Sequence, residues 1–349
     1  MFILCRIEEC MEEVNRHILG LVEEQTHLLH EMLLREDRNK IRDLIQEKFI
    51  GKIMEVHNGS LPAELIKEIF INMYNLELKY LDEKEERKLL VSSNNNVKFL
   101  DINEMFGLGY VNPTIIGGPC AIESTESLEK VAVMLQSLNI KFIRAGAFKP
   151  RTSPYDFQGL GEEGLKILRE VSDKYSLYAV TEVMDTRAVD IVDKYTDVFQ
   201  IGARNMQNFE LLKEVGRYNK PVILKRGMSS TINELIYASE YIALQGSRKI
   251  IICERGIRTF ENKTRNTLDI SSIPIIKIET KLPVIVDLSH SLGRKDIILQ
   301  IAKAALAVGA DGIMVEVHPN PQTALSDSNQ QLNLLEFKNL INGLNLLIK

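Results

Sequence analysis

Apolar residues follow two different periods along this chain of 349 residues. Over residues 1–90 they recur every three or four positions, which is the spacing of one face of an amphipathic helix. This spacing predicts a first helix around residues 7–33, a second over Arg38–Val56 and a third from Pro62 towards Leu81. The turn-forming segment His57–Pro62 separates the last two helices, and proline suits the first position of a helix. The pattern therefore predicts a small all-α domain over residues 1–90.

From about residue 114 the period changes, and short, continuously apolar runs alternate with amphipathic helical stretches. Runs of this kind are typical of parallel strands that are buried on both faces of a sheet. Eight runs can be counted, at Ile115–Cys120, Phe142–Gly146, Tyr178–Thr181, Val198–Gly202, Val222–Lys225, Ile250–Cys253, Val284–Asp287 and Gly312–Val317. The helical stretches between them include Thr125–Leu138, Leu160–Tyr175, Thr231–Leu244 and Arg294–Val308.

Eight near-regular β-α units over residues 114–349 predict an α/β fold, a (β/α)8 TIM barrel. A doubly wound open sheet of the same length is the alternative, but the regular repetition favours a closed barrel. Between the two domains, the charged and asparagine-rich stretch Asp82–Asn96 predicts the end of the third helix and a linker. Residues 91–113 are therefore assigned to a linker and a segment that leads into the barrel.

The composition excludes several classes of protein. A net charge of −5 argues against nucleic acid as a general partner, because binding to a phosphate backbone needs a basic surface. The cysteines form neither a disulfide framework nor a zinc-binding pattern. The first residues turn acidic after four apolar positions, unlike a secretory signal, and no apolar run approaches the length of a membrane span. The sequence therefore predicts a cytoplasmic protein without a membrane partner.

Basic residues gather where the predicted strands end, which is where a barrel of this kind carries its catalytic groups. Five of them lie at the ends of four predicted strands: Arg144, Lys149, Arg204, Lys225 and Arg255. Cations that converge on one cavity repel each other unless anions lie among them. The pattern therefore predicts a multiply charged anionic substrate, such as a phosphate ester that also carries a carboxylate.

A second set of strand-end residues offers both soft and hard metal ligands. A thiolate, an imidazole and two carboxylates from different loops could bind one divalent transition metal ion and leave a position open. These residues are Cys120, His290, Glu316 and Asp327. His318 lies two positions from Glu316 on the same predicted strand face, so the residues alone leave open which of the two is a ligand. Cys120 taken alone is more typical of a small buried core residue.

Nearly all of residues 100–349 resembles the 3-deoxy-D-arabino-heptulosonate 7-phosphate (DAHP) synthases, and most closely their short-barrel type Iβ. The motifs that carry this resemblance are GPCAIES (118–124), RAGAFKPRTSPYDFQGLG (144–161), IGARNMQNFELL (201–212), LKRG (224–227), CERGIRTFE (253–261), TRNTLDIS (264–271), DLSHSLGR (287–294) and EVHPNP (316–321) with ALSDSNQQ (324–331).

The resemblance implies a metal-dependent condensation of phosphoenolpyruvate with erythrose 4-phosphate to DAHP and phosphate, the first step of the shikimate pathway to aromatic amino acids. It assigns phosphoenolpyruvate to the five cations listed above, and the phosphate of the aldose to Arg151 and Thr152. It assigns the metal ion to Cys120, His290, Glu316 and Asp327 rather than to His318. It also gives catalytic roles to Lys149, Cys120 and His290. This ligand set accepts manganese, iron, cobalt or zinc, so the identity of the metal stays open.

A sister family makes 3-deoxy-octulosonate 8-phosphate from arabinose 5-phosphate on the same barrel. Its loop typically reads like KANRSS, whereas this chain has Lys149-Pro-Arg-Thr-Ser153. That difference favours the four-carbon aldose and leaves octulosonate synthase as the alternative. A role in primary or in secondary metabolism stays open.

Residues 1–90 resemble in outline the AroQ-type chorismate mutase domain that precedes the barrel in some family members. The resemblance lies in Leu4–Arg6 and Leu61–Phe70. The catalytic pattern is poorly kept, because Gln25 stands where an arginine is expected and Lys79 stands where a glutamine is expected. The resemblance therefore implies a domain for dimerisation, or for feedback control by chorismate or prephenate, whose mutase site is degenerate.

Three functional hypotheses follow for the whole chain. The first is a synthase, expected as a homodimer or homotetramer, with a non-catalytic helical domain. The second is a bifunctional synthase and mutase. The third is a non-enzymatic regulatory paralogue, which is disfavoured because the barrel keeps the whole set of metal and phosphate residues.

Overall fold

The computed structural model describes residues 2–33, 35–36, 38–86, 89–109, 113–149, 153 and 155–345. They divide into two compact units, Met1–Leu89 and Leu90–Lys349. Among these residues, no helix combines the length with the apolar character that crossing a membrane requires.

The first unit is entirely helical, which confirms the prediction of an N-terminal helical region. Its elements are α1 (Phe2–Leu33), α2 (Arg38–Leu44), the π-helical turn η1 (Ile45–Phe49), α3 (Ile50–Val56) and α4 (Ala63–Glu86). The predicted second helix is thus one helical stretch that is interrupted by a π-helical turn. Its apolar side chains at helical spacing, including Ile41, Ile45 and Ile50, pack with Leu29 and Leu78 into the core of this unit.

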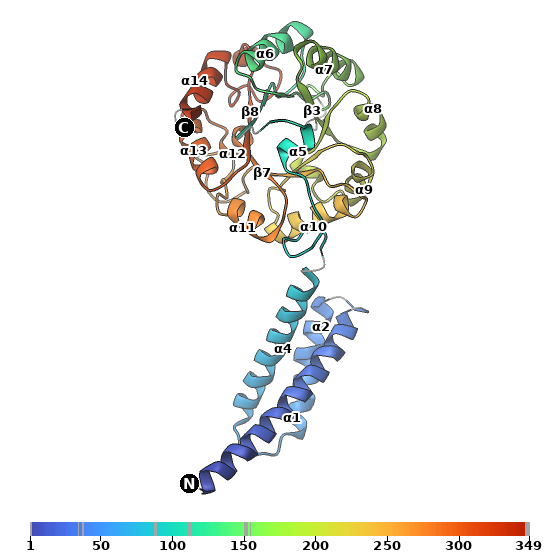
Figure 1. Cartoon of the computed structure of the whole chain (residues 1–349), viewed down its shortest axis with the longest axis vertical. Coiled ribbons are helices and arrows are strands. Elements are labelled where there is room, and N and C mark those ends of the chain that lie inside the picture. Colours follow the sequence, from blue (N-terminus) through green and yellow to red (C-terminus); the bar gives the residue numbers. More distant parts are fainter. Residues whose placement is uncertain are drawn as a thin grey trace. The chain divides into compact units, whose positions relative to one another are not determined.

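The second unit is a closed barrel of eight parallel strands in sequence order (Figure 1), which confirms the predicted (β/α)8 fold. The strands are β1 (Thr114–Gly118), β2 (Phe142–Arg144), β3 (Tyr178–Val183), β4 (Val198–Ile201), β5 (Val222–Lys225), β6 (Ile250–Glu254), β7 (Val284–Asp287) and β8 (Gly312–Glu316). Each predicted apolar run overlaps one strand. The first two runs are longer than their strands, because Pro119–Cys120 and Ala145–Gly146 already belong to the loops that follow.

Helices surround this barrel and cover the outer face of its strands (Figure 1). They are α6 (Thr125–Ser137), α7 (Glu162–Tyr175), α8 (Val189–Asp193), α9 (Phe209–Gly216), α10 (Ile232–Ala243), α11 (Ser272–Glu279), α13 (Ile298–Ala307) and α14 (Leu334–Asn345). The short helix α12 (Leu288–Leu292) directly follows β7, and 3-10 turns lie at η2 (Thr186–Ala188), η3 (Ala203–Asn205) and η4 (Pro321–Thr323).

One further short helix, α5 (Ile102–Phe106), closes the barrel at the N-terminal ends of the strands. Phe106 packs edge-on against Phe142 at the start of β2, with ring centroids 4.7 Å apart, and lies at the same distance from Tyr178 at the start of β3. The sequence analysis treated this segment as part of the entry to the barrel and did not predict a helix. The available signal was the capping box formed by Asp101 and Glu104. With this end closed by α5, the site described next lies at the opposite end.

The closure of the barrel brings the two ends of its sequence together. β1 and β8 pair in parallel along their whole length, with Gly118 opposite Glu316. The loop after β1, which carries Cys120, therefore begins beside the last residue of β8. A side chain on Gly118 would clash with the backbone of the neighbouring strand, because its Cβ would lie 2.0 Å from the carbonyl oxygen of Arg144.

Candidate active site

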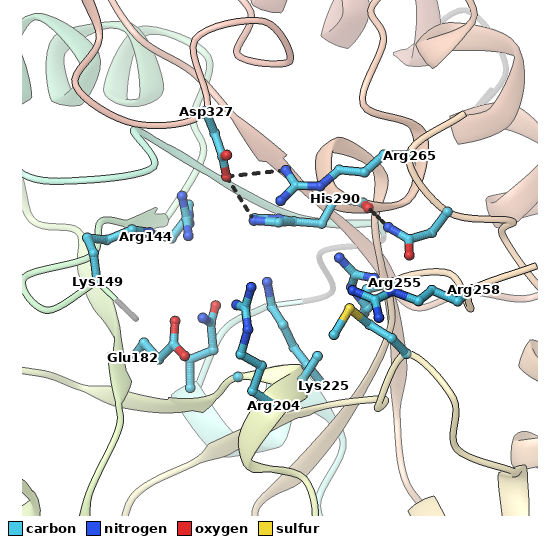
Figure 2. A pocket seen from close by; sticks show the side chains of 15 residues that line it. Arg144, Lys149, Glu182, Arg204, Lys225, Arg255, Arg258, Arg265, His290 and Asp327 are labelled. Atoms are coloured by element: carbon cyan, nitrogen blue, oxygen red, sulfur yellow. Dashed lines mark hydrogen bonds and ion pairs between the residues drawn. The ribbon is translucent and has the colours of Figure 1, made fainter. Parts of the chain in front are cut away.

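A polar cavity of about 230 Å³ opens where the strands of the barrel end (Figure 2). Among the fifteen described residues that line it, seven are arginine or lysine and two are acidic. The basic ones are Arg144, Lys149, Arg204, Lys225, Arg255, Arg258 and Arg265. The structure thus brings together all five cations that the sequence analysis singled out, and adds two more.

Two of the cations are the last residues of their strands, and each is paired with a buried carboxylate. Arg144 at the end of β2 donates from Nη1 to Glu316 Oε1 at 3.0 Å and to the carbonyl oxygen of Pro119 at 2.9 Å. Lys225 at the end of β5 donates from Nζ to Asp287 Oδ2. Buried charges need such partners, because taking an unpaired ion out of water costs several kcal/mol.

Other cations in the cavity are less well neutralised. Arg255, which follows β6, is buried and donates from Nη1 to the carbonyl oxygen of Gly256 at 3.4 Å. Its burial lowers the pKa of the guanidinium. Arg204 lies in η3 after β4 and points into the same space (Figure 2). Guanidinium groups in this state call for an anionic ligand, and their planar fork suits phosphate and carboxylate oxygens.

Lys149 reaches the cavity from the loop after β2 and lies beside the loop after β1. Its Nζ donates to the carbonyl oxygen of Cys120 at 3.0 Å and to Sγ of the same residue at 3.1 Å. The ammonium therefore stands between the basic part of the cavity and the thiol.

Three potential metal ligands lie close together on the neighbouring wall. The Sγ of Cys120 and carboxylate oxygens of Glu316 and Asp327 all lie within 4.8 Å of one another. His290 in α12 turns its Nε2 towards the two carboxylates, at 3.6 Å from Glu316 Oε1 and 3.5 Å from Asp327 Oδ2. The structure therefore brings together the four residues that the sequence analysis assigned to a metal ion.

A hydrogen bond orients the imidazole of His290 towards this cluster. Its Nδ1 lies 2.8 Å from Asp287 Oδ2, and Asp287 Oδ1 accepts from its backbone N–H at 3.0 Å. Because the ring donates to a carboxylate through Nδ1, Nε2 faces Glu316 and Asp327, where its lone pair would be available to a bound metal ion. Metal-binding histidines usually show this arrangement.

The electrostatics of the cluster fit a cation. Burial alone would raise the pKa of Asp287, but His290 and Lys225 outweigh it and hold that pKa well below its ordinary value. In the same way, His290 and Arg265 hold the pKa of Asp327 low against the effect of burial. Burial raises the pKa of the Cys120 thiol to about 11, and only a strong local cation such as a metal ion would deprotonate it. The donor set of sulfur, imidazole and carboxylate oxygen suits a divalent transition metal.

His318, the other potential ligand beside Glu316, does not join this cluster. Its Nδ1 accepts from the backbone N–H of Asn320 at 3.1 Å, and its Nε2 lies 3.4 Å from Glu123 Oε2. Both ring nitrogens are thus engaged outside the cavity, so the structure favours Glu316 between the two alternatives.

Some residues of the cavity were missed by the sequence analysis. Arg258 and Arg265 line the cavity (Figure 2). Asn266, which also lines it, donates to the carbonyl oxygen of His290 at 2.8 Å. The signal was their position in the segment after the sixth apolar run, which supplies Arg255 as well. Asp287 could have been found from its spacing of three residues before His290. The two residues assigned to the phosphate of the aldose, Arg151 and Thr152, lie outside the described residues.

The barrel matches proteins of known name. Residues 98–348 match the family model described as the DAHP synthetase I family. A phospho-2-dehydro-3-deoxyheptonate aldolase of Thermotoga maritima is 55% identical over 243 residues, which are 69% of this chain and 71% of the relative. A 2-dehydro-3-deoxyphosphooctonate aldolase of Legionella pneumophila is 33% identical over 248 residues, which are 66% of this chain and 89% of that relative.

Solved structures agree with this match. The crystal structure of the phospho-2-dehydro-3-deoxyheptonate aldolase (DAHP synthase) of Thermotoga maritima superposes with a TM-score of 0.69 at 52% identity, over 74% of this chain and 76% of that one. A truncated form of the 3-deoxy-D-arabino-heptulosonate 7-phosphate synthase of the same organism gives a TM-score of 0.66 at 48% identity, over 74% of this chain and 95% of that one.

Proposed function

This chain belongs to the DAHP synthetase I family, and we propose that it condenses phosphoenolpyruvate with erythrose 4-phosphate to give DAHP and inorganic phosphate. The observation that carries this proposal is the cavity at the strand ends, where seven described cations lie beside a cluster of metal-type ligands. Few substrates match such a cavity as well as a phosphate ester that carries a carboxylate and reacts with a phosphorylated aldehyde.

Phosphoenolpyruvate would occupy the basic part of this cavity. Its phosphate and carboxylate need cations from several directions, and four strand ends supply five of them: Arg144, Lys149, Arg204, Lys225 and Arg255. Arg144 and Lys225 keep carboxylate partners and are held in place by them, whereas Arg255 is free to receive a ligand anion from the cavity. Bidentate guanidinium contacts would fix the orientation of the enol phosphate.

A divalent metal ion would be held by Cys120, His290, Glu316 and Asp327. The fit rests on the donor set, on the orientation of His290 by Asp287 and on the closeness of the thiol to two carboxylates. When bound, the ion would supply Lewis-acid polarisation of the aldehyde of the second substrate. Manganese, iron, cobalt and zinc all suit these ligands.

The residues of the chain would carry the remaining steps. C3 of phosphoenolpyruvate attacks the aldehyde carbon, water adds at C2, and phosphate leaves by cleavage of its bond to C2. Lys149 is suited to give a proton to the aldehyde oxygen as the C–C bond forms, because its ammonium lies between the cations and Cys120. The guanidinium groups would stabilise the phosphate before and after it leaves.

The identity of the aldose follows from the loop after β2. Arg151 and Thr152 are proposed to bind the phosphate of erythrose 4-phosphate, on the resemblance of this loop to that of the DAHP synthases. The greater identity to the heptonate aldolase than to the octonate aldolases supports the same choice. Condensation with arabinose 5-phosphate is the alternative.

The helical unit is proposed to hold two copies of the chain together and to take part in feedback control by chorismate or prephenate. Side chains of α1 that no described residue covers support a partner helix: Met11, Val14, Ile18 and Leu21 are 54–65% exposed. Residual mutase activity is disfavoured because Gln25 donates to the buried carboxylate of Glu77 at 3.3 Å. An acidic residue therefore lies beside this position, where a basic residue would be needed to bind a dianionic substrate. Glutamate in place of Ile18 should yield monomers in analytical ultracentrifugation, whereas glutamate in place of the equally exposed Val133 on the barrel should not.

A cytoplasmic location is proposed on chemical grounds. Cys10, Cys120 and Cys253 are free thiols, and a thiolate ligand at Cys120 would need a reducing compartment.

The first test is the consumption of phosphoenolpyruvate by the purified full chain, with erythrose 4-phosphate or with arabinose 5-phosphate, each with and without a chelator. Turnover with the four-carbon sugar alone, abolished by the chelator and restored by a divalent metal, is the expected result. Turnover of arabinose 5-phosphate would move the chain to the octulosonate enzymes. Absence of turnover with either sugar, with metal bound, would contradict the synthase proposal.

A further inference from the structure

The loop between β8 and α14 is anchored from outside the cavity by side chains that touch no substrate site. A parallel bridge between Val317 and Leu332 closes the loop at its base. Near its tip, Asp327 has a φ of +50°, in the left-handed region that costs free energy for a residue with a side chain. The surroundings of Asp327, a proposed metal ligand, therefore hold its backbone in this conformation, which its own backbone preference does not favour.

Glu123, in the loop after β1, contacts this loop from outside the cavity. Its Oε1 accepts from the backbone N–H of Leu325 at 2.8 Å, two residues before Asp327. Its Oε2 faces Nε2 of His318 at 3.4 Å. One carboxylate thus contacts the loop at two points before its tip, at His318 near its start and at Leu325 two residues before Asp327.

The tautomer of His318 follows from its contacts. Nδ1 accepts from the backbone N–H of Asn320 at 3.1 Å, so the proton of the neutral ring lies on Nε2, which faces both Glu123 Oε2 and Ser127 Oγ at 3.4 Å. The His318 side chain is only 5% exposed, and that of Glu123 is 16% exposed. Solvent therefore competes little with these contacts, in which a hydrogen bond at each end, to Asn320 and to Leu325, flanks the contact between His318 and Glu123.

We infer that Glu123 and His318 are positioning residues that hold Asp327 where it can bind the metal ion. In the held conformation, Asp327 Oδ2 lies 3.5 Å from both Cys120 Sγ and His290 Nε2. Neither Glu123 nor His318 lines the cavity, so their effect passes through the backbone of the loop. This inference rests on the proposed metal site and adds two residues to which no role in the reaction has been assigned above.

The test compares Co²⁺ binding by the full chain and its variants without substrate. Binding is followed by the absorption of the cobalt–thiolate bond to Cys120 and by the dissociation constant. Glu123→Ala should weaken binding about 10- to 100-fold, as is usual for groups that orient metal ligands. Glu123→Gln should lose less, because its amide oxygen still accepts from the N–H of Leu325.

His318→Phe gives a second, independent variant, since it keeps the ring and removes both nitrogen contacts; it should also weaken binding. Glu126→Ala is the matched control, because Glu126 lies three residues on, is exposed and pairs only with Lys130 among the contacts described. It should bind Co²⁺ like the parent. Circular dichroism melting identifies any variant that fails to fold.

Two results would overturn the inference. The first is parent-like Co²⁺ affinity in folded Glu123→Ala and His318→Phe, which would make both residues merely structural. The second is an equal loss in Glu123→Gln and Glu123→Ala, which would deny the role of the hydrogen bond to Leu325. A parent chain that shows no cobalt–thiolate absorption would instead contradict the proposed metal site, and this inference with it.

Discussion

Replacement of Asp287 by asparagine tests how the proposed metal site is oriented. The wild-type carboxylate is buried and makes three contacts: to Nδ1 of His290 at 2.8 Å, to the backbone N–H of His290 at 3.0 Å, and to Nζ of Lys225. Asparagine keeps the shape and one acceptor oxygen but removes the negative charge. The imidazole becomes a poorer ligand and its tautomer is no longer fixed.

The expected loss of metal affinity is about 10- to 100-fold, or about 1.4–2.7 kcal/mol, which is the usual effect of removing a carboxylate that orients a metal-binding histidine. Titration calorimetry with Mn²⁺ on the metal-free full chain measures this quantity. Asp185→Asn is the control, because Asp185 caps η2 and pairs with Arg187 at the surface. Metal affinity within twofold of the parent in Asp287→Asn would refute the reasoning, as would an equal loss in the control.

Three further predictions concern other parts of the molecule. Arg255→Ala removes a buried cation that has no carboxylate partner within hydrogen-bonding distance among the described residues. It should weaken phosphoenolpyruvate binding about 10- to 100-fold, measured by ligand titration, while Lys130→Ala at the surface should not. Glu77→Gln should stabilise the helical unit at pH 7. Burial raises the pKa of Glu77 above its ordinary value of 4.5, so the protonated side chain favours the folded state. The stability that Glu77 contributes is therefore full below pH 4.5 and is lost as pH rises through the raised pKa, whereas glutamine stays neutral throughout. Hydrogen exchange of α4 peptides should show the parent, but not the variant, becoming less protected between pH 4 and pH 7. Phe106→Ala should lower the stability of the barrel by about 3 kcal/mol in denaturant unfolding and leave the KM for phosphoenolpyruvate unchanged, because α5 lies at the other end of the strands.

The strands and the main site residues could be predicted because two local signals coincide. A buried parallel strand is continuously apolar, and it ends where a polar residue reaches the cavity, as at Arg144 and Lys225. In a closed barrel these ends converge, so residues far apart in sequence could be assigned to one site without knowledge of their contacts.

Other features depend on packing that a local pattern does not contain. Helix α5 is five residues long and is stabilised by rings from β2 and β3 rather than by its own period. The ambiguity between Glu316 and His318 has a similar origin. Alternation along a strand puts both on one face, but β8 ends at Glu316, and the chain beyond it turns His318 towards Glu123. The contact with Glu123, which is distant in sequence, therefore determines that Glu316 and not His318 faces the metal-type ligands.

The pairing of β1 with β8 has a consequence for synthesis on the ribosome. Cys120 leaves the ribosome early, whereas Asp327 is 207 positions further along the chain and Glu316 closes the last strand. A nascent chain that has folded its first seven strands would hold Cys120 and His290 without either carboxylate, and would retain a metal ion poorly. Tight metal retention would thus mark a barrel whose translation has passed β8 and whose first and last strands have met.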